Sequence, residues 1–199
     1  MNTRTTDYRN YLALGDSYTI GEGVPLHDSF PYQLVQLLRS RGNDFSAAEI
    51  IARTGWTSGQ LMDQLNSTRL SSTYDLVTLL IGVNNQYRGL PLVVFRKEAA
   101  ELATTAIRAA GERAGSVRWL SIPDWGLTPF AKERSQRQIA TEIDEYNFLC
   151  RSLAESAGIP FIDITGDTRE HPDWLAADGL HYSAEMNGRW AEKIALTIE

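Results

Sequence analysis

Residues that could together activate a serine nucleophile lie near the two ends of the sequence. Ser17 follows Gly15 and Asp16, directly after an apolar run. His181 lies in "ADGLHYS", three residues after Asp178. A serine hydroxyl becomes nucleophilic when a base takes its proton, and a carboxylate on the imidazole Nδ1 leaves Nε2 free to be that base. Ser17, His181 and Asp178 are therefore candidates for the nucleophile, the general base and its orienting acid.

Two further histidines and one further aspartate compete for these roles. His27 has an aspartate directly beside it, and adjacent side chains usually point in different directions. His171 is separated by a rigid proline from the aspartate that follows it. Asp163, in "FIDIT", is the main alternative orienting acid, although a carboxylate at the end of a strand more often caps the following turn. The spacing therefore favours the pair Asp178 and His181.

Attack on a carbonyl group also requires hydrogen-bond donors for the negative charge that develops on the carbonyl oxygen. Gly55 lacks a Cβ, so its backbone N–H can approach a ligand closely, and Asn84 can offer its side-chain amide. Together with the N–H of Ser17, these groups form a candidate oxyanion hole. Each signal is weak alone, because a glycine after a strand is usually a turn former and Asn84 or Asn85 can simply cap a loop.

The elements that must bring these residues together alternate along the chain. Short apolar runs rich in β-forming residues are followed by longer amphipathic stretches. The predicted strands are Tyr11–Gly15, Ala47–Ala52, Leu76–Gly82, Val117–Ile122 and Phe161–Ile164. The predicted helices are Tyr32–Arg41, Ser58–Leu65, Val93–Ala114, Gln136–Ala157 and Ala184–Ile198. The segments Asp124–Arg134 and Gly166–Tyr182 show no clear pattern.

This alternation predicts an α/β fold. Apolar residues fill consecutive positions of runs such as "LVTLLIG", as in strands that helices cover on both faces. We therefore expect a single domain over residues 1–199, a three-layer α/β/α sandwich with a mostly parallel five-stranded sheet. Ligands of such folds bind beyond the carboxyl ends of the strands. Ser17, Gly55, Asn84 and Trp125 each follow a predicted strand, so we expect them at that edge.

Charge and hydropathy argue against two classes of partner. The net charge is −6 and no cluster of lysines and arginines stands out, so nucleic acid is a poor candidate. No apolar run approaches the roughly 18 residues that a membrane helix needs, so no integral membrane segment is expected.

The sequence also bears on location. The first ten residues are polar, and no apolar segment behind them resembles the core of a signal peptide. This predicts a cytoplasmic location, while a secreted or periplasmic location fits if a signal peptide has been removed. Cys150 is the only cysteine, so no disulfide can form within the chain and we expect this residue to fill core space.

Taken in order, the motifs resemble those of the SGNH hydrolases, also called the GDSL esterase/lipase family. "ALGDSYTIGEG" resembles the first family motif and places Ser17 at the nucleophile. "RTGWTSGQL" and "IGVNNQ" resemble the second and third motifs, with Gly55 and Asn84 at the family glycine and asparagine. "ADGLHYS" resembles the last motif, whose Asp-x-x-His element corresponds to Asp178 and His181. The four matches run in family order and span almost the whole chain.

The resemblance implies a flavodoxin-like SGNH hydrolase fold and a carboxylic ester hydrolase that forms an acyl-enzyme. It also implies a triad of Ser17, His181 and Asp178, with no metal ion and no organic cofactor. Two positions depart from the usual family pattern. Asn85 lies where aspartate is frequent, which leaves the oxyanion role of its neighbour intact. Tyr18 lies where leucine or isoleucine is frequent, which affects the shape of the substrate site.

A small-molecule ester is the expected substrate. The chain has little room for a large lid, which favours small or short-chain acyl esters, acetyl esters among them. The predicted substrate-binding residues are Trp56, Tyr87 and Trp125, within a wider set of apolar candidates that adds Phe130, Trp174 and Leu175. Each of these side chains can equally pack in the core or in a loop. A lysophospholipase or a thioesterase of the same family is an alternative.

A different class of protein is a non-catalytic, flavodoxin-like binding module that holds a flavin or a phosphate in the same crevice. The loop after the first strand argues against it, because Asp16 would repel an anion and the pair Asp178 and His181 would have no task. A relative that has lost catalysis would be expected to lack a motif residue, whereas all are present. We expect Asp16 to hold the loop by accepting backbone hydrogen bonds.

Overall fold

The computed structural model describes residues 8–70 and 73–198 of the 199-residue chain. A sheet lies at its centre, with the strand order β2-β1-β3-β4-β5 in the described residues, and every strand pair is parallel. All residues of β1 and β3 are buried, as expected for strands covered on both faces. The strands are β1 (Tyr11–Gly15), β2 (Glu49–Ala52), β3 (Leu76–Leu80), β4 (Val117–Leu120) and β5 (Phe161–Ile162).

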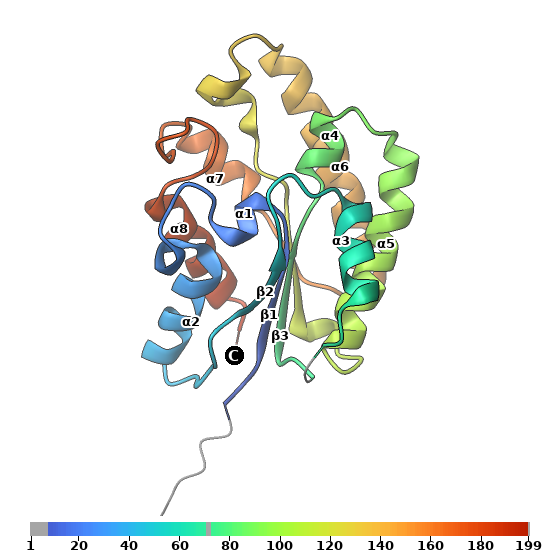
Figure 1. Cartoon of the computed structure of the whole chain (residues 1–199), viewed down its shortest axis with the longest axis vertical. Coiled ribbons are helices and arrows are strands. Elements are labelled where there is room, and N and C mark those ends of the chain that lie inside the picture. The colour runs from blue at the N-terminus through green and yellow to red at the C-terminus, as the bar shows by residue number, and fades with distance from the viewer. Residues whose placement is uncertain (1–7, 71–72, 199) are drawn as a thin grey trace, which may run out of the picture.

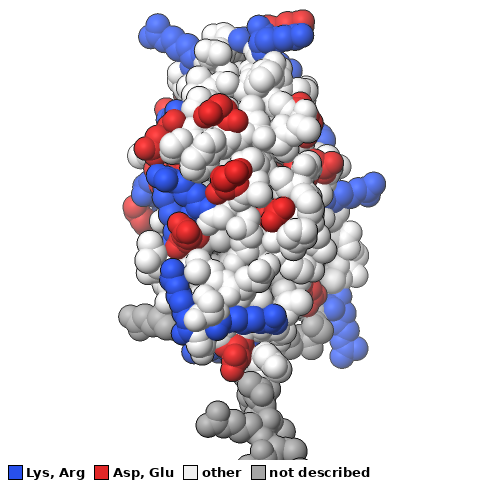
Figure 2. All heavy atoms as spheres, turned by 90° about the vertical axis from the view of Figure 1, so that its left-hand side faces the viewer, with Lys and Arg blue, Asp and Glu red and all other residues white. Residues whose placement is uncertain are grey.

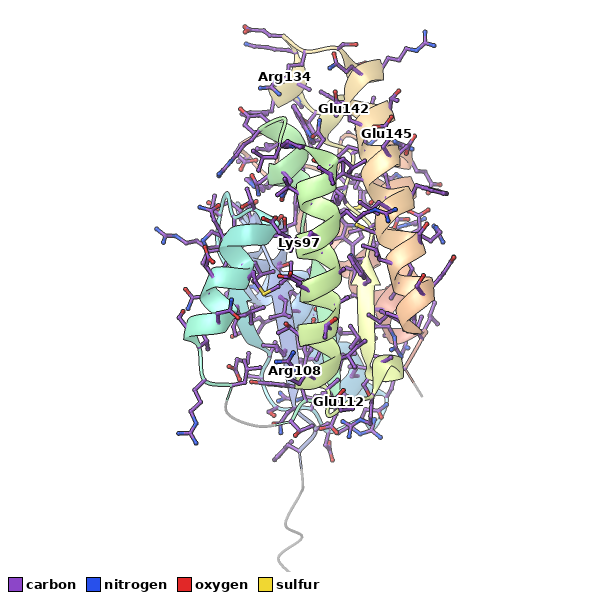
Figure 3. All side chains as sticks on the ribbon, turned by 90° about the vertical axis from the view of Figure 1, so that its right-hand side faces the viewer. Lys97, Arg108, Glu112, Arg134, Glu142 and Glu145 are labelled. Atoms are coloured by element: carbon purple, nitrogen blue, oxygen red, sulfur yellow. The ribbon has the colours of Figure 1, made fainter. Side chains whose placement is uncertain are left out.

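Helices cover both faces of this sheet (Figure 1). On one face, α2 (Phe30–Ser40) packs against α8 (Ala184–Ala195). On the other face, α5 (Leu92–Ala109) lies between α3 (Ser58–Ser67) and α6 (Gln136–Ala157), as Figure 3 shows. The predicted three-layer α/β/α sandwich with a parallel five-stranded sheet is therefore confirmed.

Shorter helices occur where the sequence shows no periodicity. α1 (Ser17–Ile20) follows β1, and α4 (Val83–Tyr87) follows β3. α7 (Thr165–Glu170) buries polar residues, and its Asp167 forms an ion pair of 2.7 Å with Arg189 of α8. Further 3₁₀ turns occupy Leu26–Asp28, Ala114–Ser116, Trp125–Leu127 and Pro129–Ala131.

The predicted boundaries differ from the structure mainly at the ends of elements. The helix Gln136–Ala157 has the predicted bounds. The helix predicted to reach Ala114 ends at Ala109, because the chain turns at Gly111, which has a φ of 65°. Three predicted strands run past the last paired residue because the apolar side chains that follow are still fully buried: Ile81, Ile122 and Ile164.

The register of the sheet brings the predicted site segments to one edge. Gly15 at the end of β1 is level with Ala52 of β2 and with Leu80 of β3. The chain leaves the sheet shortly after each of these residues, so the segments that carry Ser17 and Asn84 start close together. A Cβ on Gly15 would lie 2.4 Å from the carbonyl oxygen of Leu80, so this close approach requires glycine.

Charges of both signs are interspersed on the face that carries α2 and α8 (Figure 2). Arg189, for example, also pairs with Glu170 at 3.0 Å. The face in this view therefore lacks the continuous basic stripe that nucleic acid binding favours. Across residues 8–70 and 73–198, each helix is too short or too polar to cross a membrane.

Candidate active site

Ser17 is the first residue of α1, at the carboxyl end of β1. Asp16 caps this helix, because its Oδ1 accepts a hydrogen bond of 3.1 Å from the N–H of Tyr18. Gly21 ends the helix after about one turn in the left-handed conformation, with a φ of 73°. Ser17 is only 5% exposed, so this short helix holds its side chain in a nearly buried position at the edge of the sheet.

His181 and Asp178 form a hydrogen-bonded pair in which Nδ1 and Oδ2 are 2.6 Å apart. The other carboxylate oxygen, Oδ1, accepts hydrogen bonds from the N–H groups of Leu180 at 3.0 Å and of His181 at 2.9 Å. Burial alone would raise the pKa of Asp178, but these hydrogen bonds lower it below its usual value. The carboxylate is therefore charged at neutral pH and holds the proton on Nδ1, which leaves Nε2 free to accept another.

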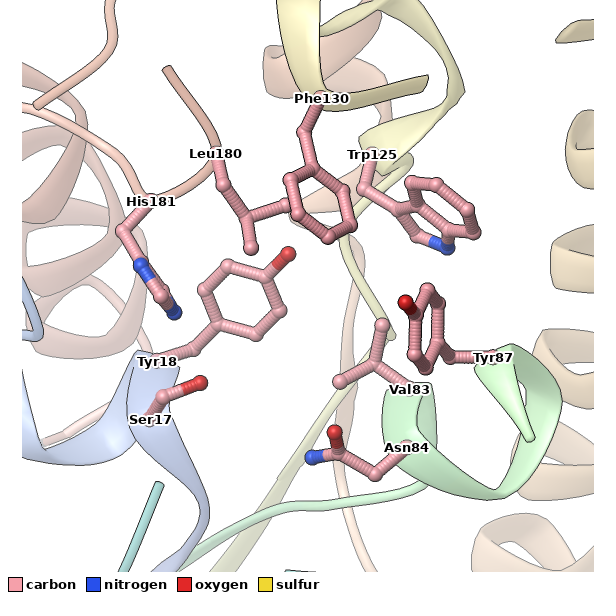
Figure 4. A pocket seen from close by; sticks show the side chains of 9 residues that line it. All are labelled: Ser17, Tyr18, Val83, Asn84, Tyr87, Trp125, Phe130, Leu180 and His181. Carbon is pink, nitrogen blue, oxygen red and sulfur yellow. The ribbon is translucent and has the colours of Figure 1, made fainter. Parts of the chain in front are cut away.

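Ser17, Asn84 and His181 line one pocket of about 110 Å³. In Figure 4 the imidazole of His181 points toward the hydroxyl of Ser17, and the amide nitrogen of Asn84 is turned toward the same region from the other side. The pocket thus brings together the predicted nucleophile, base and side-chain amide. Its other lining residues are Tyr18, Val83, Tyr87, Trp125, Phe130 and Leu180.

The predicted oxyanion donors Ser17, Gly55 and Asn84 come from the segments that follow β1, β2 and β3. Within the described residues, the N–H groups of Ser17 and Gly55 donate to no protein acceptor. Gly55 has a φ of 80°, and Arg88 donates a hydrogen bond of 2.5 Å to its carbonyl oxygen. The Nδ2 of Asn84 donates to the carbonyl oxygen of Trp56 at 3.0 Å, which orients the amide and leaves its second hydrogen unpaired. Gly55 and Trp56 are not among the residues that line the pocket.

Asn85 has a different environment from Asn84. Its side chain is fully buried, its Oδ1 accepts a hydrogen bond of 2.9 Å from the N–H of Ser58, and its Nδ2 donates to Ser58 Oγ at 2.7 Å. The same hydroxyl is hydrogen bonded to Glu98 of α5. Asn85 therefore ties α4 to the start of α3, and both ends of its amide are engaged in that contact.

Aromatic rings form one wall of the pocket (Figure 4). Tyr87 meets Trp125 edge-on with ring centroids 5.4 Å apart, and Phe130 lies 6.0 Å from each of them. Trp125 Nε1 donates a hydrogen bond of 2.8 Å to Gln86, which fixes the ring. The guanidinium of Arg134 lies 4.4 Å from the centroid of the Tyr87 ring. Two of the three predicted substrate-binding side chains, Tyr87 and Trp125, thus lie in this wall.

Three other candidate residues, Trp56, Trp174 and Asp163, lie outside the pocket. The ring of Trp56 packs against the core while its carbonyl holds Asn84. Trp174 stacks on His171 with ring centroids 4.0 Å apart. Asp163 accepts a hydrogen bond of 3.2 Å from the N–H of Gly166 in the first turn of α7, a contact of the kind expected of a carboxylate at a strand end.

Val83 and Leu180 line the pocket, although nothing in the sequence singled them out. Each directly precedes a motif residue, Asn84 or His181. Adjacency to a motif residue is the only sequence feature that points to Val83 and Leu180, because two consecutive side chains can face one cavity where the backbone turns.

Asp16 is buried beside the candidate nucleophile. It is 1% exposed, and its Oδ2 has no hydrogen-bond partner within the described residues. Burial raises the pKa of Asp16 to about 7, although the hydrogen bond from the N–H of Tyr18 opposes this shift. The carboxyl group therefore holds the loop through Oδ1. Because it is buried, it also accepts a proton more readily than a solvated aspartate does.

Asp16 should make the stability of the protein depend on pH. The folded state keeps this proton up to a pKa of about 7 and the unfolded chain loses it near the ordinary value, so the free energy of unfolding falls as the pH rises between the two. The side chain of Asp16→Asn stays neutral at every pH, so the variant does not show this fall in the free energy of unfolding. We expect the variant to gain on the order of 2–4 kcal/mol relative to wild type between about pH 4 and about pH 8. Chemical denaturation measures the gain, and a constant difference across this range would contradict the prediction.

A serine beside a histidine–aspartate pair and an amide donor, at the carboxyl edge of a parallel sheet, can carry out acyl transfer. This chemistry and the fold define a class of serine-dependent hydrolases. The sequence model of the GDSL-like lipase/acylhydrolase family matches residues 13–189, and the chain belongs to this family.

Similar proteins agree with this assignment. An arylesterase of Vibrio mimicus is 26% identical over 188 residues, which cover 92% of this chain and 85% of that protein. The crystal structure of TesA has a TM-score of 0.77 at 18% identity, covering 96% of this chain and 98% of that one. An acetyl xylan esterase, AlAXEase, has a TM-score of 0.73 at 19% identity, covering 96% and 100%. Family membership together with the arylesterase relative makes this chain a carboxylic ester hydrolase.

Proposed function

We propose that the enzyme hydrolyses short-chain carboxylic esters through an acyl-enzyme formed on Ser17. The observation that carries this proposal is that Ser17, Asn84 and His181 line one small pocket, while Asp178 is hydrogen bonded to Nδ1 of His181. A non-catalytic binding module would not require the hydrogen-bonded pair of Asp178 and His181.

In the first half-reaction, His181 Nε2 takes the proton of Ser17 as Oγ attacks the ester carbonyl carbon. The tetrahedral intermediate then collapses, the bond to the alcohol oxygen breaks, and the alcohol leaves with the proton from His181. In the second half-reaction, His181 takes a proton from water, which attacks the acyl carbon. Ser17 Oγ recovers that proton as the carboxylic acid leaves. Asp178 stabilises the imidazolium in both halves.

The oxyanion would be held by the N–H groups of Ser17 and Gly55 and by the amide of Asn84. These backbone N–H groups are without acceptors in the described residues, and Asn84 Nδ2 has one hydrogen to spare. Donors that are already positioned stabilise developing charge without reorganising during the reaction.

Pocket size supports a small acyl or alcohol group. A free volume of about 110 Å³ lies below the roughly 300–1,000 Å³ of ordinary ligand pockets. Acetyl and other short chains fit such a space better than the long chains of a lysophospholipid. A series of p-nitrophenyl esters from acetyl to octanoyl tests this proposal through kcat/KM. We expect a decline beyond butyryl, and a maximum at octanoyl would contradict it.

The two neighbouring asparagines should have separable effects. Asn84→Ala removes an oxyanion donor and is expected to lower kcat by about 10²–10³-fold with little loss of stability. Asn85→Ala removes both hydrogen bonds to Ser58, leaves the Ser58 N–H without a partner, and should lower the free energy of unfolding by about 1–3 kcal/mol. Steady-state kinetics and denaturant unfolding of both variants measure these effects. A larger loss of kcat in folded Asn85→Ala than in Asn84→Ala would show that the oxyanion role belongs to Asn85.

A further inference from the structure

Tyr18, the residue after the candidate nucleophile, has a ring that its neighbours hold in place. It is 5% exposed and lines the pocket. Its ring meets His181 edge-on with centroids 5.6 Å apart, and Trp190 edge-on at 6.3 Å. Tyr182 lies 5.6 Å away in a tilted arrangement. The direction of the Tyr18 hydroxyl is therefore set by packing rather than by a hydrogen bond.

That hydroxyl points into the pocket, away from His181 (Figure 4). It makes no hydrogen bond to any group within the described residues. Other buried phenols of this protein are paired: Tyr11 with Thr78 at 2.9 Å, and Tyr182 with the carbonyl oxygen of Asp124 at 3.0 Å. A ligand that fills the pocket would shield this hydroxyl from solvent, and a shielded hydroxyl without a partner is costly, so the ligand is the natural source of its hydrogen bond.

The surroundings of the Tyr18 hydroxyl are mostly apolar, with Val83, Phe130 and Leu180 among the lining residues. Tyr87 contributes the other phenol, but it is 38% exposed, so solvent can reach it. Burial, followed by the negative charge of nearby groups, raises the pKa of Tyr18 well above its usual value, so the hydroxyl stays protonated. The pocket is therefore lined by one hydroxyl on a buried ring, Tyr18, that faces an apolar space and can both donate and accept.

We propose that Tyr18 selects esters that carry a hydroxyl group on the short chain that fills this pocket. The inference rests on the proposed ester hydrolysis and names its substrate class more closely. A substrate hydroxyl can both give and receive a hydrogen bond, which matches the two capacities of a phenol. A plain alkyl chain would instead bury the Tyr18 hydroxyl without a partner. The hydroxyl can belong to the acyl side or to the alcohol side of the ester.

Two pairs of esters distinguish these sides. The acyl pair is p-nitrophenyl butyrate and p-nitrophenyl 3-hydroxybutyrate, and the alcohol pair is ethyl acetate and 2-hydroxyethyl acetate. For each pair, the ratio of kcat/KM with and without the hydroxyl is measured in wild type, Tyr18→Phe and Tyr182→Phe. Tyr18→Phe keeps the packed ring and removes only an unpaired hydroxyl, so it should fold. Tyr182→Phe is a matched control, because it removes a phenol of the same aromatic cluster that does not line the pocket.

We expect the hydroxylated ester to be preferred by about 3–10-fold in one of the pairs, which is the range of one net hydrogen bond. The preference should persist in Tyr182→Phe and fall to about one in Tyr18→Phe. The pair that shows it identifies the side of the ester. A ratio near one for wild type in both pairs, or a preference that Tyr18→Phe leaves unchanged, overturns the inference while ester hydrolysis stands. Absence of hydrolysis of all four esters by wild type overturns both.

Discussion

Ser17→Ala is expected to lower kcat for p-nitrophenyl acetate by at least about 10⁴-fold, which is the largest effect the proposed mechanism predicts. The variant lacks the atom that attacks the carbonyl carbon, so no acyl-enzyme can form. Residual hydrolysis would come from the oxyanion donors and from substrate binding, which act without the nucleophile. Initial rates, corrected for spontaneous hydrolysis, measure the loss.

A control separates loss of the nucleophile from a general effect of removing a hydroxyl. Ser40→Ala changes an exposed serine on α2, whose hydroxyl bonds only to the carbonyl oxygen of Leu37. This variant should keep the wild-type rate. Ser17→Ala itself should remain folded, because no hydrogen bond from the Ser17 hydroxyl to the described residues is lost. Equal rates for Ser17→Ala and wild type would rule out the proposed mechanism.

Asp178→Asn is expected to lower kcat by about 10³-fold or more, the second largest effect. Oδ1 can be retained by the asparagine and still accept from the N–H groups of Leu180 and His181, so the turn should persist. The new amide nitrogen would face Nδ1 of His181, which stabilises the tautomer with its proton on Nε2. That nitrogen could then no longer take the proton of Ser17. The imidazolium would also lose its counter-charge.

Asp163→Asn is the matched control for this prediction, since Asp163 was the competing orienting acid. Its carboxylate accepts hydrogen bonds from Ser121 and from the first turn of α7. We expect kcat of Asp163→Asn to stay within about twofold of wild type, as for a residue outside the reacting groups. A greater loss in Asp163→Asn than in Asp178→Asn would show that Asp163, and not Asp178, orients His181. Kinetics of the two variants at neutral pH decide between them.

Most of the fold is predictable from the sequence because buried strands and long helices leave extended signals. β3 is an unbroken buried run, and Gln136–Ala157 carries apolar residues at helical spacing. Such signals need length. α1 and α4 have only four and five residues, too few for a helical period to repeat. The sequence does not indicate α7 for another reason. This helix buries polar residues in place of an apolar face, and their partners, such as Arg189, lie on a different helix.

The order of the motifs locates the candidate site residues, but it does not give the direction of their side chains. Trp56 shows why. It follows Gly55, whose φ of 80° turns the backbone, so the carbonyl of Trp56 meets Asn84 while its ring packs on the core. Side-chain direction after such a turn depends on backbone angles that residue types do not encode. Tyr18 departs from the usual family pattern, but the unpaired state of its hydroxyl depends on packing that the motif does not encode.

Covalent labelling tests the central role of Ser17 most directly. A fluorophosphonate should react as an ester does, because Ser17 Oγ forms a bond to phosphorus, the bond to fluorine breaks, and His181 takes the hydroxyl proton. The phosphonylated serine is stable, so intact mass spectrometry can count the adduct and peptide sequencing can place it. We predict one adduct per wild-type chain on Ser17, and much slower labelling of His181→Ala. An adduct on a different residue, or ester hydrolysis that continues while Ser17 stays unlabelled, would contradict the account.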